Sequence, residues 1–442
     1  MDFKKYTRNV FATLSTEFFI HALTFITTVL IVRKLSTEDF GIFSLVISFS
    51  LTLCYLSSIG LPQAIIYFIG KKKGEIDKLV STYLLLFFCI SSGFIIITYL
   101  FKEYFFLTIL KDLPRNYFIP MLIIYFFTLL AAFLLSIIRG IKEFNLFNRL
   151  RILYPMLYFA GILVISALSF TTLKSFVILY AAINIVLYSA FFIKIVHKLS
   201  IRFKPDASSV IPLISYGLKS YLQLISGHLI YQADIYIIAY LMDARHVAFY
   251  AISVSVATLL WYLPNTVGIV LFPELSSIPS EKEIHKISTM VCRNTLMIAF
   301  LGAIFLSIAG KYLIQYIYGA EYIHSINAML LILPGVVIMS IYKVLTRNFS
   351  SRNRQQVSIM AASISLIVNI GLNFVLIPRY GIEGAAIAST VSYFLAGAIL
   401  VFAVNRESNI SIGKILFVNR TDMSAYLDVV LRLTKKTKLQ GS

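Results

Sequence analysis

Long apolar runs alternate with short polar interruptions along the whole chain. Each run holds about 20 residues or more, the length that an α-helix needs to cross a hydrocarbon core of about 30 Å. The pattern therefore predicts twelve membrane-spanning helices. Their predicted ranges are 10–32, 41–69, 79–101, 117–138, 150–170, 173–196, 213–241, 247–272, 284–308, 325–345, 355–377 and 382–404.

Two of these runs are longer than a single span requires, and each contains a proline. Pro62 lies in the run 41–69, and Pro264 lies in the run 247–272. A proline inside a helix removes one backbone hydrogen bond and clashes with the preceding turn, so we expect a kink or local unwinding at both places. Together with Pro334, these two prolines are predicted gating points.

The segment that follows the last apolar run is too polar to cross a membrane. Between Met423 and Leu431 apolar residues recur at helical spacing, and the basic stretch LTKKTK follows. The pattern favours a basic amphipathic tail, 405–442, whose helix lies on the anionic inner leaflet. A disordered, solvated tail is the alternative. The other interruptions are too short to hold a soluble domain.

Composition agrees with this pattern. Hydrophobic residues make up 59% of the chain, charged residues only 13%, and the mean hydropathy is +0.85. Soluble domains carry about 25% charged residues. The sequence therefore predicts an all-α polytopic membrane protein.

The distribution of basic residues predicts the orientation. With a cytoplasmic N-terminus, 29 of the 39 Lys and Arg residues fall on the cytoplasmic side of the predicted spans. This bias in short loops places both termini in the cytoplasm. It also accounts for the net charge of +19, which in a soluble protein would suggest binding to nucleic acid. We expect no nucleic-acid partner.

Side chains suited to metal binding or catalysis do not gather in any recognisable motif. The three cysteines are isolated, and neither a CxxC nor an HExxH pattern occurs. We expect no metal, no cofactor and no disulfide framework. A membrane-embedded polymerase, ligase or glycosyltransferase is disfavoured because the sequence has neither a DxD cluster nor a sizeable outer loop.

A weak internal repeat relates the two halves of the chain. A shift of 207 residues aligns Phe40–Ser48 with Val247–Ser255, and it places His21 on His228. This shift equals six predicted spans, so the two halves would run in the same direction through the membrane. Transporters built from such parallel repeats hold their cargo between the halves. We therefore expect two six-helix lobes, 1–204 and 205–404, around a central cavity.

One predicted span carries a narrow polar stripe. In the stretch TEFFIHALTF, Glu17 and His21 lie one helical turn apart, in line with Thr13, Thr24 and Thr28. An ionisable group at mid-membrane depth costs about 2.5–3.5 kcal/mol, so the stripe should face protein or a water-filled cavity. Glu17 and His21 are candidates for ion coupling. A packed intrahelical pair is the alternative.

The seventh predicted span has a second polar face. Lys219, Gln223, Ser226 and Asp234 fall within roughly 80° of one another, with His228 off this arc or at its border. Lys219, Gln223 and His228 are candidate cavity-lining residues, and Asp234 is a candidate for ion coupling. Lys219 lies near the end of the span, where it would also be able to snorkel to the membrane surface.

Three segments carry a resemblance to a known family. NIGLNFVLIPRYGIEGAAIASTVSYFLAG, Asn369–Gly397, resembles the Wzx-type polysaccharide flippases of the multidrug/oligosaccharidyl-lipid/polysaccharide superfamily. LIVRKLSTEDFGIFSLV, Leu30–Val46, is similar to the junction between the first two spans in that family. VLFPELSSI, Val270–Ile278, is a looser match.

The resemblance implies a flippase of the inner cell membrane that works by alternating access. Its cargo would be an undecaprenyl-pyrophosphate-linked oligosaccharide for O-antigen, capsule or lipopolysaccharide synthesis. Lys219, with Arg8 or Arg293, would attract the pyrophosphate, although cytoplasmic arginines also serve membrane topology. H⁺ or Na⁺ would drive transport, and a polysaccharide polymerase and a chain-length regulator are further implied partners. The alternative is a multidrug or metabolite cation antiporter of the same superfamily.

Overall fold

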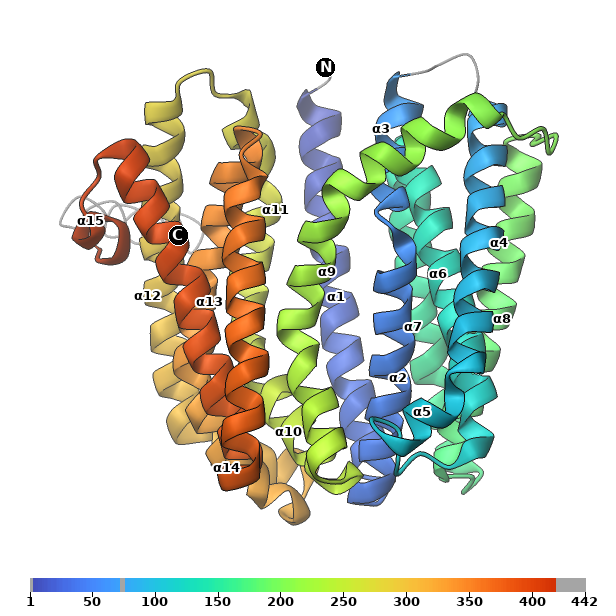
Figure 1. Cartoon of the computed structure of the whole chain (residues 1–442), viewed down its shortest axis with the longest axis vertical. Helices are drawn as coiled ribbons and strands as arrows, with labels where there is room; N and C mark the ends of the chain where they lie inside the picture. The colour runs from blue at the N-terminus through green and yellow to red at the C-terminus, as the bar shows by residue number, and fades with distance from the viewer. Residues whose placement is uncertain (1–2, 72–75, 419–442) are drawn as a thin grey trace, which may run out of the picture. The chain divides into compact units, whose positions relative to one another are not determined.

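The computed structural model describes residues 3–71 and 76–418, with the backbone alone described for residues 3–14, 219, 220, 223 and 273. Every regular element in these ranges is a helix, and no strand occurs in them (Figure 1). The first α-helices are α1 Phe3–Val32, α2 Thr37–Ser58, α3 Leu61–Lys71, α4 Ile76–Leu100, α5 Lys102–Leu107, α6 Phe118–Gly140, α7 Phe144–Ala167 and α8 Leu173–Lys198. The later ones are α9 Val210–Leu241, α10 Ala244–Ala257, α11 Tyr262–Ser277, α12 Glu281–Leu313, α13 Ser325–Ser351, α14 Gln355–Ser408 and α15 Ile412–Leu416.

The number of membrane spans agrees with the sequence pattern. Eleven described segments are long and apolar enough to cross a membrane. The longest helix, α14, is interrupted at Gly381, where φ is 59° and ψ is −138°. This break divides α14 into two lengths that correspond to the predicted spans 355–377 and 382–404. The predicted all-α polytopic architecture is confirmed, while the orientation of the termini stays a prediction.

The backbone breaks inside both of the long proline-containing runs. Ile59 and Gly60 adopt left-handed conformations between α2 and α3, with φ values of 46° and 68°. Pro62 follows in the first turn of α3, where a missing N–H group removes no helical hydrogen bond. In the second run a 3₁₀ turn, Thr258–Trp261, separates α10 from α11, and Pro264 lies in the first turn of α11. Each break therefore lies just ahead of its proline.

Internal contacts divide the chain into two compact units. The first unit contains the described part of Met1–Ile252, together with Tyr312–Ser325 and Asn373–Ala385. The second contains Ser253–Lys311, Ile326–Leu372 and the described residues from Ala386 onward. The predicted lobes 1–204 and 205–404 stay a prediction. The tail helix predicted beyond Thr421 lies outside the described residues.

Aromatic packing forms much of the core of the first unit. Helix α6 lies against α2, α3 and α8, as can be followed in Figure 1. The rings of Tyr83 on α4 and Phe133 on α6 stack at 4.5 Å, and both side chains are fully buried. Gly60 lets the α2–α3 break approach α9 closely, because a Cβ atom there would lie 2.1 Å from the carbonyl oxygen of Gly217.

Candidate functional site

The carboxylate of Glu17 is held by an arginine from another helix. Arg151, two turns into α7, donates through both Nη atoms to the two carboxylate oxygens, and the Nη2 to Oε2 distance is 2.9 Å. The side chain of Glu17 is 19% exposed, and that of Arg151 is 25% exposed. His21 Nε2 lies 3.9 Å from Glu17 Oε2. A bidentate arginine pair offsets the cost of placing a carboxylate inside a membrane, which answers the question that the polar stripe raises.

The remaining polar atoms of this stripe are partly satisfied by α1 itself. The hydroxyls of Thr24 and Thr28 donate to the carbonyl oxygens of Ile20 and Thr24 at 2.8 Å and 2.9 Å. Such bonds to the preceding turn satisfy a hydroxyl without any external partner. Among the described side chains of the stripe, this leaves Glu17 and His21. Of these two, Glu17 pairs with α7 through Arg151.

A second arginine adds positive charge beside this ion pair. The guanidinium groups of Arg139 and Arg151 lie 5.6 Å and 5.3 Å from the ring centroid of Phe147. Arginine over an aromatic face gains about 0.5–2 kcal/mol depending on desolvation. Two guanidinium groups and one carboxylate leave this part of the first unit with excess positive charge. Counting basic residues assigned both arginines to topology, but Arg139 lies in the last turn of α6, and Arg151 lies two turns into α7, which begins at Phe144 and not at residue 150 as predicted.

Asp234 is buried among neutral donors. Its side chain is 1% exposed and lies on α9. Tyr250 on α10 donates its hydroxyl to Oδ2 at 2.5 Å, and Asn373 on α14 donates its amide to Oδ1 at 2.6 Å. Asn373 belongs to the segment Asn369–Gly397 that carries the family resemblance. The structure therefore brings that segment to a residue that the sequence selected independently.

The two histidines that the 207-residue shift aligns have different surroundings. His228 on α9 lies 2.8 Å from the hydroxyl of Thr52, and its ring stacks on Tyr55 at 4.1 Å. Thr52 is also hydrogen-bonded to Tyr236. His21 instead lies beside Glu17. His228 thus belongs to a contact between α2 and α9 and not to the ionic cluster of α1.

The other predicted cavity residues are placed less completely. Arg293 on α12 is 9% exposed and donates to the carbonyl oxygen of Lys414 in α15 at 3.2 Å. The side chains of Arg8, Lys219 and Gln223 lie outside the described residues. The grouping of these four residues around one cavity stays a prediction.

Pro334 lies within α13, at a close contact with the second half of α14. A proline at this position leaves the carbonyl oxygen of Leu330 without its helical donor and crowds the preceding turn. Thr390 donates its hydroxyl to the carbonyl oxygen of Leu331 at 2.7 Å. A Cβ atom at Gly335 would lie 2.6 Å from Thr390 Cα, so the helices touch there. An apolar pocket of about 380 Å³ adjoins the proline and is bordered by Phe300.

Lys343 and Arg347 form a pair of cations that sequence reasoning did not select. They lie one turn apart on α13, within the helix and before its end at Ser351. Lys343 Nζ lies 4.3 Å from the ring centroid of Trp261, whose indole donates to the carbonyl oxygen of Val336 at 3.0 Å. The spacing of four residues was the available signal, but loop counting treated both cations as topological.

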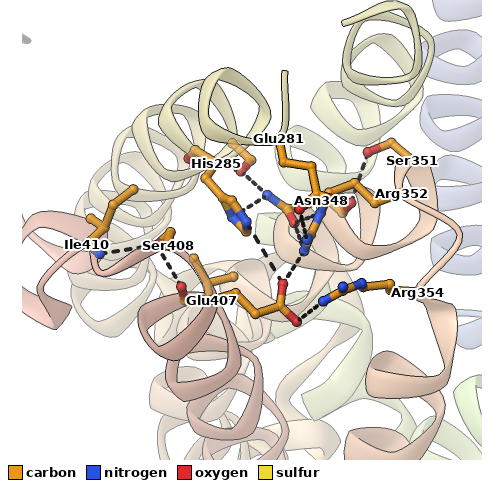
Figure 2. Close-up of polar contacts among 11 residues, drawn as sticks. Glu281, His285, Asn348, Ser351, Arg352, Arg354, Glu407, Ser408 and Ile410 are labelled. Atoms are coloured by element: carbon orange, nitrogen blue, oxygen red, sulfur yellow. Dashed lines mark hydrogen bonds and ion pairs between the residues drawn. The ribbon is translucent and has the colours of Figure 1, made fainter. Parts of the chain in front are cut away.

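A charged cluster ties together three helix ends of the second unit (Figure 2). Arg352, just after α13, lies 2.7 Å from Glu407 in the last turn of α14 and 3.5 Å from Glu281 at the start of α12. Its side chain is only 2% exposed. Arg354 lies 3.1 Å from the other oxygen of Glu407, and Asn348 accepts from Arg352 at 2.8 Å. Buried charges that are paired and hydrogen-bonded in this way avoid the cost of isolated burial.

The family follows from a comparison with known proteins. A family model described as "Polysaccharide biosynthesis protein" matches residues 6–279, which is more than half of the chain. The chain belongs to the polysaccharide biosynthesis protein family. The family predicted from the resemblance is confirmed. The match includes Leu30–Val46 and Val270–Ile278 and ends before Asn369–Gly397, the segment in which the resemblance is most specific.

Relatives of this chain include proteins named for glycan transport. The chain is 23% identical over 193 residues to the probable low-salt glycan biosynthesis flippase Agl15 of Haloferax volcanii, in an alignment that covers 43% of this chain and 41% of that protein. It is 24% identical over 411 residues to the uncharacterized membrane protein MJ1068 of Methanocaldococcus jannaschii, covering 87% and 81%. It is 22% identical over 182 residues to a putative O-antigen transporter of Shigella flexneri, covering 40% and 43%. The first and third alignments thus span less than half of either relative.

Solved structures of transporters share the fold. The lipid II flippase MurJ in an inward closed conformation superimposes with a TM-score of 0.76 at 17% identity, over 91% of this chain and 89% of that one. An inward-facing multidrug resistance transporter of the MATE family gives 0.73 at 14% identity, over 88% and 94%. The chain is therefore a multi-pass protein of the cell membrane with a transporter fold. None of the proteins named here is described as an enzyme.

Proposed function

We propose that this protein is a flippase that moves a polyprenyl-pyrophosphate-linked oligosaccharide from the inner to the outer leaflet of the cell membrane. Membership of the polysaccharide biosynthesis protein family supports this function, as do relatives named as a flippase and as an O-antigen transporter. Alternating access between the predicted lobes would expose the sugar and pyrophosphate to each side in turn.

The observation that carries the proposal is the position of cations inside helices. Lys343 and Arg347 lie on α13, Arg139 lies in the last turn of α6, and Arg151 lies two turns into α7. A cation in a loop is fully solvated, whereas a cation within a spanning helix is partly removed from water and attracts an anion more strongly. Such positions suit a pyrophosphate, because arginine and lysine form strong charge-assisted hydrogen bonds with phosphate oxygens. Lys219, Arg8 and Arg293 stay candidates for the same role.

Transport would be coupled to an inward gradient of H⁺ or Na⁺. Glu17, His21 and Asp234 support this part of the proposal, because they place two carboxylates and an imidazole within spanning helices. A cation that binds Glu17 would compete with Arg151 for the carboxylate and so loosen the contact between α1 and α7. A polysaccharide polymerase and a chain-length regulator stay predicted partners.

The test uses cells that lack the gene. We would measure the fraction of lipid-linked oligosaccharide in each leaflet and the amount of surface glycan. The wild type should restore both, whereas the double substitution Lys343→Ala and Arg347→Ala should lower outer-leaflet cargo at least tenfold. Arg115→Ala is the matched control, because Arg115 is exposed and pairs with Glu103. Normal surface glycan in the deletion strain would contradict the proposed function. Full rescue by the double variant would contradict the cation site on α13.

A multidrug or metabolite cation antiporter is the second candidate. The superposition with the MATE-family transporter and the buried carboxylate of Asp234 favour it, because a carboxylate attracts cationic cargo. This function predicts that deletion raises sensitivity to lipophilic cations and leaves the surface glycan unchanged. Asp234→Asn should then abolish efflux.

A further inference from the structure

A polar pocket lies in the first unit, where three turns of the chain meet. Its volume is about 360 Å³. The first two turns of α10 contribute Arg245, His246 and Phe249, the 3₁₀ turn before α13 contributes His324, and the segment after the break in α14 contributes Glu383. None of the candidate cavity, ion-coupling or gating residues named from the sequence borders it. With both termini in the cytoplasm, as the charge bias predicts, this pocket lies on the outer side of the membrane.

The wall formed by α14 depends on two glycines. Gly381 has a φ of 59°, a conformation that residues with a side chain rarely adopt. A Cβ atom at Gly384 would lie 2.4 Å from the carbonyl oxygen of Leu376, so the chain folds back tightly after the break. Glu383 stands between these glycines and borders the pocket. The most specific segment of the family resemblance thus builds one wall of the pocket.

Two opposite charges border the pocket without neutralising partners. The side chains of Arg245 and Glu383 have no hydrogen bond or ion pair to any other residue in the described part of the chain. A guanidinium group binds a carboxylate through two parallel hydrogen bonds. A glutamate carboxylate accepts hydrogen bonds from hydroxyl groups. The pocket therefore offers one site for an acid and one for hydroxyls.

The imidazole of His246 is fixed by a neighbouring acid. Burial raises the pKa of the Asp243 carboxyl. Hydrogen bonds from the backbone N–H and the ring of His246 together lower it by more than burial raises it, so this pKa lies below its usual range. An ionised carboxylate only accepts, so the His246 Nδ1 atom, at 2.7 Å from Asp243 Oδ1, carries a proton. Nε2 remains available to a ligand.

The apolar floor of the pocket is aromatic. Phe249 is 8% exposed, and the His324 ring lies 5.3 Å from it at a tilt of 49°. A flat ring beside hydrogen-bonding groups suits a pyranose, which has an apolar C–H face and polar edges. The donors, the acceptor and this floor together match the chemistry of a hydroxylated ring that carries a carboxylate.

We propose that this pocket binds an acidic sugar through Arg245, with Glu383 and His246 on its hydroxyl groups. The proposal rests on the proposed function, since it names the acidic sugars of the cargo as the ligand class. A sugar bound on the outer side would hold the headgroup after translocation and oppose its return. Arg245 would set the preference for acidic over neutral sugars.

Direct binding to the full chain in lipid nanodiscs tests this proposal. Saturation-transfer NMR suits weak ligands, and the probes are glucuronate, glucose and inorganic phosphate. Glucuronate should bind at least tenfold more tightly than glucose, and Arg245→Ala should remove that preference. Glu383→Gln should weaken both sugars. Arg379→Ala is the matched control, because Arg379 is an exposed arginine near the same break that does not border the pocket.

Each outcome separates the site from the transport activity. Equal binding of glucuronate and glucose, or an Arg245→Ala variant that binds like the wild type, would overturn the acidic-sugar site. Displacement of glucuronate by inorganic phosphate at equal concentration would overturn it in favour of a phosphate site. These results would leave flipping untouched, because leaflet distribution in cells is measured separately. Loss of flipping with intact sugar binding would instead contradict the proposed function.

Discussion

Substitution of Glu407 should destabilise the second unit more than removal of its exposed partner. Glu407 Oε2 lies 2.7 Å from Arg352, whose side chain is 2% exposed (Figure 2). Breaking a buried ion pair by removing one partner costs about 3–5 kcal/mol, because the remaining charge stays buried and uncompensated. Glu407 is 22% exposed and Glu281 stays 3.5 Å from Arg352, so we expect Glu407→Gln to cost about 3 kcal/mol.

The matched control removes a contact with the same carboxylate. Arg354 lies 3.1 Å from Glu407 Oε1 but is 51% exposed. Exposed ion pairs contribute about 0–1 kcal/mol, so Arg354→Gln should cost less than about 1 kcal/mol. Both variants replace one charged side chain of the cluster with a neutral amide, and the comparison therefore tests the effect of burial of the partner charge.

Fluorescence of the single tryptophan provides the assay. Trp261 belongs to the second unit, as the cluster does, so its emission follows unfolding of that unit. Unfolding of the purified protein in mixed micelles would be titrated with sodium dodecyl sulfate and compared among variants. The double substitution Arg352→Met with Glu407→Leu should recover part of the loss, since apolar residues often replace a buried ion pair without cost. Equal destabilisation by Glu407→Gln and Arg354→Gln would refute the reasoning.

Three further substitutions test contacts between helices. Gly60→Ala should lower the yield of folded, monodisperse protein on size exclusion, because its Cβ would lie 2.1 Å from a carbonyl oxygen of α9, whereas Gly70→Ala, with no atom within 4 Å, should leave the yield unchanged. Asn373→Ala should cost about 1–3 kcal/mol in a micelle titration followed by far-UV circular dichroism, which also reports the helices of the first unit, because it removes a hydrogen bond from buried Asp234; an unchanged midpoint would contradict the contact. Thr390→Val should cost about 1 kcal/mol and speed amide exchange around the middle of α13; unaltered exchange would show that the hydroxyl does not support this turn.

The spans were predictable because their signal is local. Apolar length alone gives α4, α6 and α8, and the gap between the predicted spans 355–377 and 382–404 contains Gly381, where α14 is interrupted. The same reasoning indicates that Glu17 needs a partner. It does not indicate which one, because Arg151 is 134 residues away and the choice depends on how α1 packs on α7.

The arginine contacts were missed from the sequence because all basic residues near span ends were counted together as topological. The positive-inside rule treats every arginine near a span end alike, yet the structure gives these arginines different surroundings. Arg354 is half exposed, Arg352 is buried in a network, and Arg151 holds a carboxylate within a span. Separating these cases needs the exact helix ends, which apolar length places only to within a few residues.

The distinction between loop cations and helix cations bears on how the cargo would be recognised. A lysine or arginine in a cytoplasmic loop is solvated, so it orients the protein at little cost and offers a phosphate little beyond what water offers. Lys343 lies two turns inside α13, against Trp261, where its charge is partly removed from water. Removing a cation from water strengthens its attraction to an anion, because the surrounding dielectric is lower. A partly desolvated cation therefore binds a pyrophosphate more strongly than a solvated one. For this reason Lys343 and Arg347 on α13 are better candidates for the cargo site than the more numerous cations of the loops.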